Sequence, residues 1–405
     1  MKFHNNRLKR WKRKGAQKLV YINLKIIKKH DSIIEKGFVR TKGGLFSEIN
    51  SMDNFAAKEK EEILNCDGLK IVPGFVDAHC HIGMWENGLN FEGADGNEET
   101  DPVCPHLRAI DGINPADDAF RDAVKAGVTT VVTGPGSANP IGGTFAAIRT
   151  FGNCVDSMII KQPVGMKFAL GENPKAIYNE KGQFPTTRMA VAALIRENME
   201  KAKRYLERLR LMESDPSIEV DYNMKLEAFK PLFERRMKAF FHCHRADDIC
   251  TAIRIAKEFK LDLVLVHATE ANKLKKKQLT GSKLIIGPLI CDRLKPELKN
   301  HSIEGFVELI EAGLCVAICS DHPVVPSNYL LQTCANLAKF GVPKLEILKL
   351  ITQRPAEICG IFNKVGSIEE FKRANFVAFN KEDDIFSAYV EPKFVVVDGK
   401  VVVKN

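Results

Sequence analysis

The segment from Gly74 to Gly83 constrains the fold more than any other part of the chain. It is an apolar run that ends in two histidines, His79 and His81, one residue apart. In a β-strand, residues i and i+2 face the same side, so these two imidazoles can bind one metal ion. Two hydrogen-bonded core histidines would give the same pattern, so the rest of the chain must decide between these interpretations.

Strand-like and helix-like segments alternate between residues 73 and 365. We expect one helix to be capped by Asn114, with Pro115 at its first position, and to end at Gly127. Repeated units of this kind favour a closed (β/α)₈ barrel, and an open doubly wound sheet is the alternative. The units that carry the pattern are the strand over 128–133, the helix over 247–259 with the strand over 261–267, and the helix over 303–312 with the strand over 314–319.

Both ends of the chain have the composition of β-strands and turns instead. Residues 19–72 read as short strands, and residues 366–405 contain further strand-like runs. One of these runs is folded by Asp398-Gly399, a two-residue hairpin signal. We therefore expect the two ends to form one small β-sandwich domain, with the barrel over residues 73–365 inserted between them.

The formal net charge of +9 is concentrated at the start of the chain. Residues 1–20 hold eight Lys and Arg residues and no acid, so the remaining residues carry a net charge of only +1. A body this close to neutral argues against a nucleic-acid-binding protein. Residues 1–18 are expected to form a basic, disordered extension. No apolar run resembles a membrane span or a secretory signal.

Cysteine usage indicates the compartment. The eleven cysteines are scattered through apolar runs without a Cys-x-x-Cys pair, which indicates free thiols in a reducing, cytoplasmic environment. We expect a small-molecule substrate, no nucleic-acid or membrane partner, and either a monomer or a homo-oligomer. The acid-rich loop over residues 86–105 either favours a cationic or polar substrate or forms a solvated lid.

Five further polar residues follow strand-like runs, at the positions where a barrel places its functional groups. They are Glu172, His242, His244, His267 and Asp321. Each one has a structural explanation, as a helix cap or as a core histidine. All five are nevertheless expected at the same rim of the barrel as His79 and His81, and this predicts a distributed metal site.

This set of side chains also indicates the chemistry. Imidazoles and carboxylates without thiolates suit a divalent ion, Zn²⁺ first and Fe²⁺ or Mn²⁺ as alternatives, in an open catalytic site. Such an ion lowers the pKa of a bound water toward about 7 and so provides a nucleophile. Asp321 is the candidate to take the proton of that water and pass it to a leaving nitrogen.

Residues 73–81, Pro-Gly-Phe-Val-Asp-Ala-His-Cys-His, resemble the first-strand signature of the amidohydrolase superfamily. Segments 366–370 and 397–400 extend the resemblance through nearly the whole chain, and it is closest to the imidazolonepropionase-like branch. The resemblance implies a distorted (β/α)₈ TIM barrel with a β-sandwich, and metal-dependent hydrolysis of a C–N bond in a cyclic amide, amide or amidine. The alternatives are a dipeptidase or N-acyl amino acid hydrolase of the same superfamily, and an inactive binding or assembly protein on the same scaffold.

The resemblance also implies a role for each residue of the predicted site. The ligands of one or two metal ions correspond to His79, His81, His242, His267 and Asp321, of which Asp321 and His267 also act in catalysis. Binuclear members add a bridging glutamate or carboxylated lysine. Glu172 is favoured over Lys167 here because it follows its strand, whereas Lys167 lies inside it.

The histidines of the fifth strand leave a choice of ligand. His242 is preferred over His244 because the family usually places its ligand first in a His-x-x-Glu-like run. His244, Arg245 and His322 are expected to contact the substrate, and the alternative for Arg245 is that it simply begins the next helix.

Overall fold

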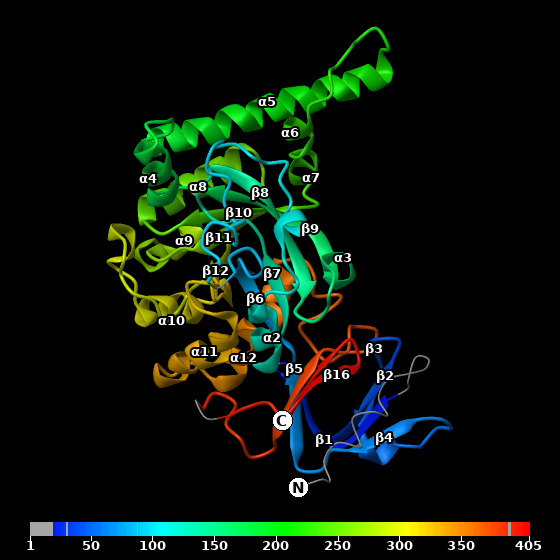
Figure 1. Ribbon diagram of the computed structural model, residues 1–405. Helices are drawn as coiled ribbons and strands as arrows, with labels where there is room; N and C mark the ends of the chain where they lie inside the picture. The colour runs from blue at the N-terminus through cyan, green and yellow to red at the C-terminus, as the bar shows by residue number, and fades with distance from the viewer. Residues whose placement is uncertain (1–18, 30, 87, 388–389) are drawn as a thin grey trace.

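The computed structural model of the protein describes residues 19–29, 31–86, 88–387 and 390–405. Its strands form two eight-stranded sheets, one built from the middle of the chain and one from its ends (Figure 1). The predicted basic extension, residues 1–18, lies outside the described residues. Within these ranges no helix is long and apolar enough to cross a membrane. All eleven cysteines lie in the described ranges as free thiols, as predicted.

The middle of the chain forms a nearly closed barrel, which confirms the predicted fold class. Seven of its strands are parallel, and β8 alone runs antiparallel to both of its neighbours, β7 and β9. This reversed strand is the distortion of the regular (β/α)₈ pattern. In hydrogen-bonded order the strands are β6 (Phe75–Cys80), β7 (Val128–Thr133), β8 (Ile141–Arg149), β9 (Ile159–Ala169), β10 (Lys238–Cys243), β11 (Leu263–His267), β12 (Lys283–Ile286) and β13 (Cys315–Ile318).

Helices connect these strands and cover the outside of the barrel (Figure 1). The longest, α5, has 27 residues and extends past the body of the molecule. The α-helices are α1 (Ala109–Gly112), α2 (Asp118–Lys125), α3 (Val155–Met158), α4 (Glu172–Glu180), α5 (Arg188–Ser214), α6 (Met224–Glu227), α7 (Lys230–Phe233), α8 (Ala246–Glu258), α9 (Lys276–Leu279), α10 (Ile303–Glu311), α11 (Leu330–Lys339), α12 (Lys344–Leu350) and α13 (Gln353–Ile358). Short 3₁₀ turns are η2 (Met52–Asn54), η3 (Ala271–Lys273), η4 (Pro296–Leu298) and η5 (Ser327–Tyr329).

One predicted helix begins later than expected. The helix α2 starts at Asp118 and is capped by Asp117, whose side chain accepts a hydrogen bond from the Ala119 backbone N–H. Asn114 instead accepts from the Ala116 N–H in the preceding turn. The prediction of an Asn114 cap was therefore wrong, because two residues with capping side chains compete here and the second one begins the helix.

Two apolar layers hold the barrel together. An inner cluster takes residues from all eight strands, among them Val76, Phe145 and Phe240. A larger outer cluster lies between the strands and the helices and includes Met166, Phe168 and Phe241. Because side chains alternate along a strand, residues next to these outer ones on β9 and β10 face the inside of the barrel.

The two chain ends form the second sheet, as expected for the β-sandwich. Phe46 on β3 and Phe376 on β14 are four places apart in strand order, yet their ring centroids are only 6.0 Å apart, so the sheet folds over itself. At the hairpin between β15 and β16, Asp398 and Gly399 both have positive φ, as a type I′ turn requires. The strand order is β16 (Lys400–Lys404), β15 (Phe394–Val397), β14 (Phe376–Asn380), β5 (Leu69–Pro73), β1 (Leu19–Lys29), β2 (Ser32–Lys42) and β3 (Leu45–Ser51), and β4 (Glu62–Asn65) pairs with β1.

A buried carboxylate closes the barrel between its first and last strands. Asp77 on β6 is fully buried and accepts hydrogen bonds from the Ser320 backbone N–H, at 3.0 Å, from the Ser320 hydroxyl and from the Ser327 hydroxyl, at 2.9 Å. Next to it, the Asp321 N–H donates to the His79 carbonyl at 3.1 Å. These hydrogen bonds therefore fix the C-terminal half of β6 to the segment that follows β13.

We predict that Asp77→Ala lowers the free energy of unfolding by at least about 3 kcal/mol, because it leaves three buried donors without their acceptor, at about 1–3 kcal/mol each. Asp77→Asn should be milder, since its amide oxygen still accepts from Ser320 and its nitrogen can donate to a hydroxyl. Urea denaturation followed by circular dichroism measures both. An unchanged midpoint for Asp77→Ala would contradict this account of closure.

Candidate metal centre

The two histidines at the end of β6 point into the barrel mouth. The Nδ1 of His81 donates to the Gly134 carbonyl at 2.7 Å, so its Nε2 keeps a free lone pair and lies 3.2 Å from Oδ1 of Asp321. The fully buried His79 has its Nε2 3.7 Å from the same oxygen. The predicted i, i+2 pair is thus directed at one carboxylate.

A second group of histidines completes the cluster. His242 and His244 come from the end of β10, and His267 comes from the end of β11. The ring centroid of His267 lies 4.7 Å from that of His242, 4.8 Å from that of His244 and 5.7 Å from that of His79. Ligand atoms of His242, His244 and His267 lie within 4.8 Å of one another, as do those of His79, His267 and Asp321. His267 therefore joins the two groups into one centre.

Two members of the cluster have an unusual backbone. His267 and Asp321 have φ values of +67° and +55°, a region that non-glycine residues rarely adopt. Along β11, Val264 and Val266 belong to the inner cluster, so a regular strand would turn His267 outward. The left-handed backbone instead directs it inward. Strain of this kind gathers at functional sites.

The charge state of the cluster is set by burial and by neighbouring groups. Burial, reinforced by neighbouring cations, holds the pKa of His79, His242 and His244 well below the usual range, so these imidazoles stay neutral. Burial alone would raise the pKa of Asp321, but the nearby His267, His81 and Lys167 outweigh it and lower the pKa. The site therefore presents neutral nitrogens around one ionised carboxylate.

The residues present fit a divalent cation. Among the described residues, the Nδ1 atom of His242 is buried without a hydrogen-bond partner, which is rare for a polar atom. The neighbouring thiols of Cys80, Cys243 and Cys319 donate to backbone carbonyls of their own or adjacent strands. Nitrogen and oxygen atoms thus form the donor set, which suits an open site for a metal such as zinc, iron or manganese.

The structure places Lys167 rather than Glu172 in this centre. Lys167 is fully buried inside the barrel, and its Nζ lies 3.3 Å from Nε2 of His79. Burial lowers its pKa to about 8, which favours the neutral amine that can be carboxylated. Glu172 begins α4, where its N–H donates to Glu297, and its side chain lines a different cavity. The geometry therefore reverses the preference for Glu172, because the strand ends before that residue and the chain turns away.

The three predicted substrate contacts are distributed differently. His244 lines the cavity over the centre, and its Nδ1 is hydrogen-bonded to Thr269 at 2.7 Å. His322 is buried behind Asp321, where its Nδ1 accepts from the Ser327 N–H. Arg245 is exposed, precedes α8 and pairs with Asp247 at 2.7 Å, so the structure does not bring it to the centre.

A cavity of about 430 Å³ lies over the centre, and some of the residues that line it were not predicted as site residues from the sequence. Among them are Trp85, Asn173 and Lys295. The Nζ of Lys295 donates to Oδ1 of Asn173 at 2.6 Å, and the amide of Asn173 lies 3.4 Å from Nε2 of His242. Trp85 and Lys295 lie in loops and Asn173 lies in the first turn of α4, and no periodic pattern singles them out. Only Asn173 could have been found from the sequence, because it directly follows Glu172.

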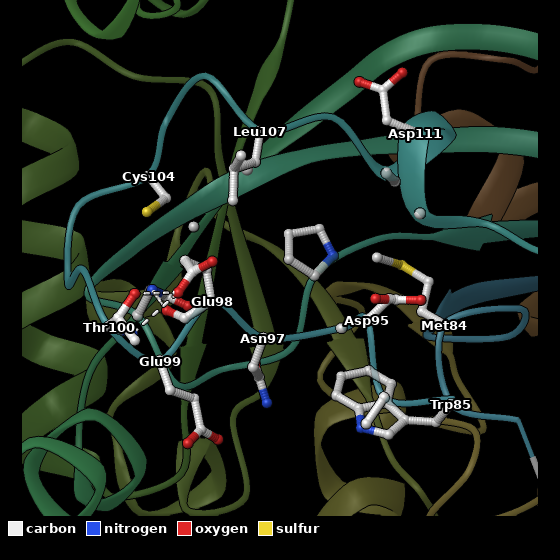
Figure 2. A pocket seen from close by; sticks show the side chains of 18 of the residues that line it. Met84, Trp85, Asp95, Asn97, Glu98, Glu99, Thr100, Cys104, Leu107 and Asp111 are labelled. Carbon is white, nitrogen blue, oxygen red and sulfur yellow. Dashed lines mark hydrogen bonds between the residues drawn. The ribbon is translucent and has the colours of Figure 1, made fainter. Parts of the chain in front are cut away.

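The acid-rich loop forms a second, neighbouring pocket (Figure 2). This pocket has a volume of about 580 Å³ and shares Trp85 and Asn97 with the cavity over the centre. Figure 2 shows the side chains of Asp95, Glu98 and Glu99 around it. The acids of this loop therefore lie beside the metal centre and do not line the cavity over it.

Comparisons with known proteins give a consistent result. The model of the family described as "Amidohydrolase family" matches residues 71–402. A crystal structure of an amidohydrolase from Thermotoga maritima is 36% identical, with a TM-score of 0.91, and covers 96% of this chain and 100% of that one. A β-aspartyl dipeptidase from Fervidobacterium islandicum, 16% identical with a TM-score of 0.59 over 96% of this chain and 97% of that one, shares the fold.

Two curated relatives are longer than the aligned region. The amidohydrolase tasK of Hapsidospora irregularis is 25% identical in an alignment of 401 positions that covers 90% of this chain and 39% of that protein. The N-acetylglucosamine-6-phosphate deacetylase of Haemophilus influenzae is 25% identical over 132 residues, which is 32% of this chain and 34% of that protein. The chain thus spans well under half of either relative.

We predict that Lys167→Met weakens divalent-metal binding by at least the roughly 10–100-fold typical of losing a group that supports a metal ligand. Glu172→Gln should leave the affinity unchanged, because Glu172 faces another cavity. Competition with a chromophoric chelator gives the affinities, and added bicarbonate should raise the metal content of the wild type but not of Lys167→Met. Loss of metal in Glu172→Gln, with retention in Lys167→Met, would restore the original preference.

Proposed function

Because the chain belongs to the amidohydrolase family, we propose that it is a metal-dependent hydrolase that cleaves a carbon–nitrogen bond of a small amide, cyclic amide or amidine. The observation that carries the proposal is the convergence of five imidazoles, one carboxylate and Lys167 at the barrel mouth. Membership of this family supports the predicted hydrolase class. The imidazolonepropionase-like branch and the bond type belong to the proposal.

The residues that would hold the metal are His79, His81, His242, His267 and Asp321, and Lys167 would join them as a further ligand once its amine is carboxylated. A divalent cation bound there supplies Lewis-acid polarisation and makes a water acidic near neutral pH. His244 would be close enough to join His242 and His267 as a ligand. Zinc is the metal we propose first, because nitrogen-rich donor sets with an open position are typical of catalytic zinc.

Asp321 is the general base and acid of the proposed reaction. Its carboxylate stays ionised because the pKa is held low, and it lies between the two groups of histidines. It can accept the proton of the attacking water and return it to the leaving nitrogen. His267 keeps one tautomer, with Nδ1 donating to Gly287 at 2.7 Å, so its Nε2 acts as a fixed neutral donor beside Asp321.

The cavity over the centre favours a small substrate. Its volume of about 430 Å³ lies within the range of small-molecule sites, and its walls combine apolar side chains with a few polar groups. A long polymer would need an open groove instead. The cavity therefore supports a small substrate, and this part of the proposal is independent of the identity of the metal.

We expect a chelator to abolish hydrolysis and a divalent metal to restore it. The double variant His79→Ala/His81→Ala should lose the metal while keeping its circular dichroism spectrum, because it removes two polar side chains and leaves every residue of the two apolar layers in place. Metal analysis and amine release from lactams, N-acyl amino acids and dipeptides are the measurements. Wild-type protein that stays metal-free after growth in supplemented medium would contradict the proposal.

We expect Asp321→Asn to reduce kcat by roughly 10²–10⁴, the usual value of general acid–base assistance. The amide cannot take up the proton of the water, but it still offers an oxygen to the metal, so metal content should change little. Both quantities should be measured on the same samples. A wild-type kcat at matched metal occupancy would remove Asp321 from the proton transfers.

A further inference from the structure

One permanent positive charge lines the cavity over the metal centre. Among the described residues that form its walls, only Lys295 is a lysine or arginine. It precedes the short turn η4, in the loop between β12 and α10, and is half-buried. An ammonium in this position costs desolvation free energy unless charged or polar groups compensate it.

The partners of Lys295 within the protein are neutral. Its Nζ donates to the amide oxygen of Asn173 at 2.6 Å, and the amide nitrogen of Asn173 in turn donates to the Ser137 hydroxyl at 2.6 Å. An ammonium has three N–H donors, so two remain for a ligand.

In the described part of the chain, the nearby carboxylates do not pair with Lys295. Asp321 faces the histidines, with an oxygen 3.2 Å from His81, and the buried Glu297 lies 3.8 Å from Nε2 of His244 and accepts from the Glu172 N–H. None of the ion pairs within the described part of the chain includes Lys295. The ammonium thus lacks a counter-ion in contact.

The remaining walls of the cavity, among the described residues, place no ion-pair partner beside Lys295. They consist of imidazoles, hydroxyls, amides, the Cys291 thiol and apolar side chains such as Trp85, together with Asp321 at the metal centre and Asp292, which is exposed at the edge. The carboxylates of the acid-rich loop line the neighbouring pocket instead (Figure 2). An anionic group that enters the cavity would therefore meet one uncompensated cation close to His242.

We infer that Lys295 binds a carboxylate of the substrate, so that the substrates are small amides that also carry a carboxylic acid. This inference rests on the proposed function, because it takes the cavity over the metal centre as the substrate site. A single ammonium matches the single charge of a carboxylate, whereas a phosphate group usually receives several cationic or N–H donors. The acid group of the substrate would then lie on the Asn173 side of the cavity, with the amide toward Asp321.

The test measures binding separately from turnover. A panel of N-acetyl-L-amino acids and their primary amides is titrated calorimetrically into the metal-loaded enzyme, so that each pair differs only in the carboxylate. We expect the wild type to bind the preferred acid about 10–100-fold more tightly than its amide, as for a hydrogen bond between charged groups. In Lys295→Met the ratio should fall to about 1, and Lys295→Arg should retain most of it.

Matched variants separate recognition from structural support. Lys299→Met, on the same loop but facing another cavity, should keep the wild-type ratio. If Lys295 only supports Asn173, Lys295→Met will weaken acids and amides equally, and the inference fails. An acid preference that persists in Lys295→Met would place the carboxylate on the metal and also overturn it. Lys295→Gln serves as the neutral variant if Lys295→Met does not fold.

The outcome also separates this inference from the proposed function. Amine release is followed on the same panel. Lys295-dependent binding of acids without hydrolysis of any member would refute the proposed reaction and leave the binding site standing. Hydrolysis of acids and amides with equal kcat/KM and equal affinity would support the proposed reaction and refute the carboxylate-binding role of Lys295. A panel in which the wild type prefers no acid over its amide would overturn the inference outright.

Discussion

The candidate metal centre depends on two backbone carbonyls that hold its histidines in one tautomer. The carbonyls of Gly134 and Gly287 accept the Nδ1 protons of His81 and His267, which leaves both Nε2 lone pairs directed inward. Both positions need glycine. A Cβ on Gly134 would lie 2.5 Å from the ring of Phe145, and one on Gly287, where φ is +120°, would lie 2.5 Å from the Cys319 carbonyl. Close packing of the loops after β7 and β12 therefore fixes the direction of the ligands.

The seam of the barrel and the metal centre share the same residues. Asp77 fixes Ser320 to β6, and the next residue, Asp321, donates its N–H to His79. The left-handed backbone of Asp321 persists because hydrogen bonds on both sides hold it. Closure of the barrel thus brings the first and last ligands together. This explains why ligands more than 200 residues apart in the sequence form one site.

The sequence alone predicts the parts of the site that depend on local pattern and on the barrel rule. His79, His81, His242 and Asp321 lie at or just after the ends of strands, and parallel strands deliver their ends to one rim. Glu172 also follows a strand, yet the chain turns away into α4 before its side chain can reach the rim.

The inward position of Lys167 could have been recognised from the sequence around it. It lies between Met166 and Phe168, which pack outward, and beside the small Gly165 and Ala169, so a buried inward lysine has room. The reversed β8 and the contact between Lys295 and Asn173 depend on tertiary packing, which no local period encodes.

The central claim is a metal held by histidine nitrogens and carboxylate oxygens while three neighbouring thiols stay out of the coordination sphere. X-ray absorption spectroscopy at the zinc edge, on protein purified from zinc-supplemented cells, tests it most directly. The account predicts a first shell of nitrogen and oxygen atoms at about 2.0–2.2 Å, with the outer-shell scattering of imidazole rings. A sulfur shell at about 2.3 Å would place Cys80, Cys243 or Cys319 on the metal and contradict the account.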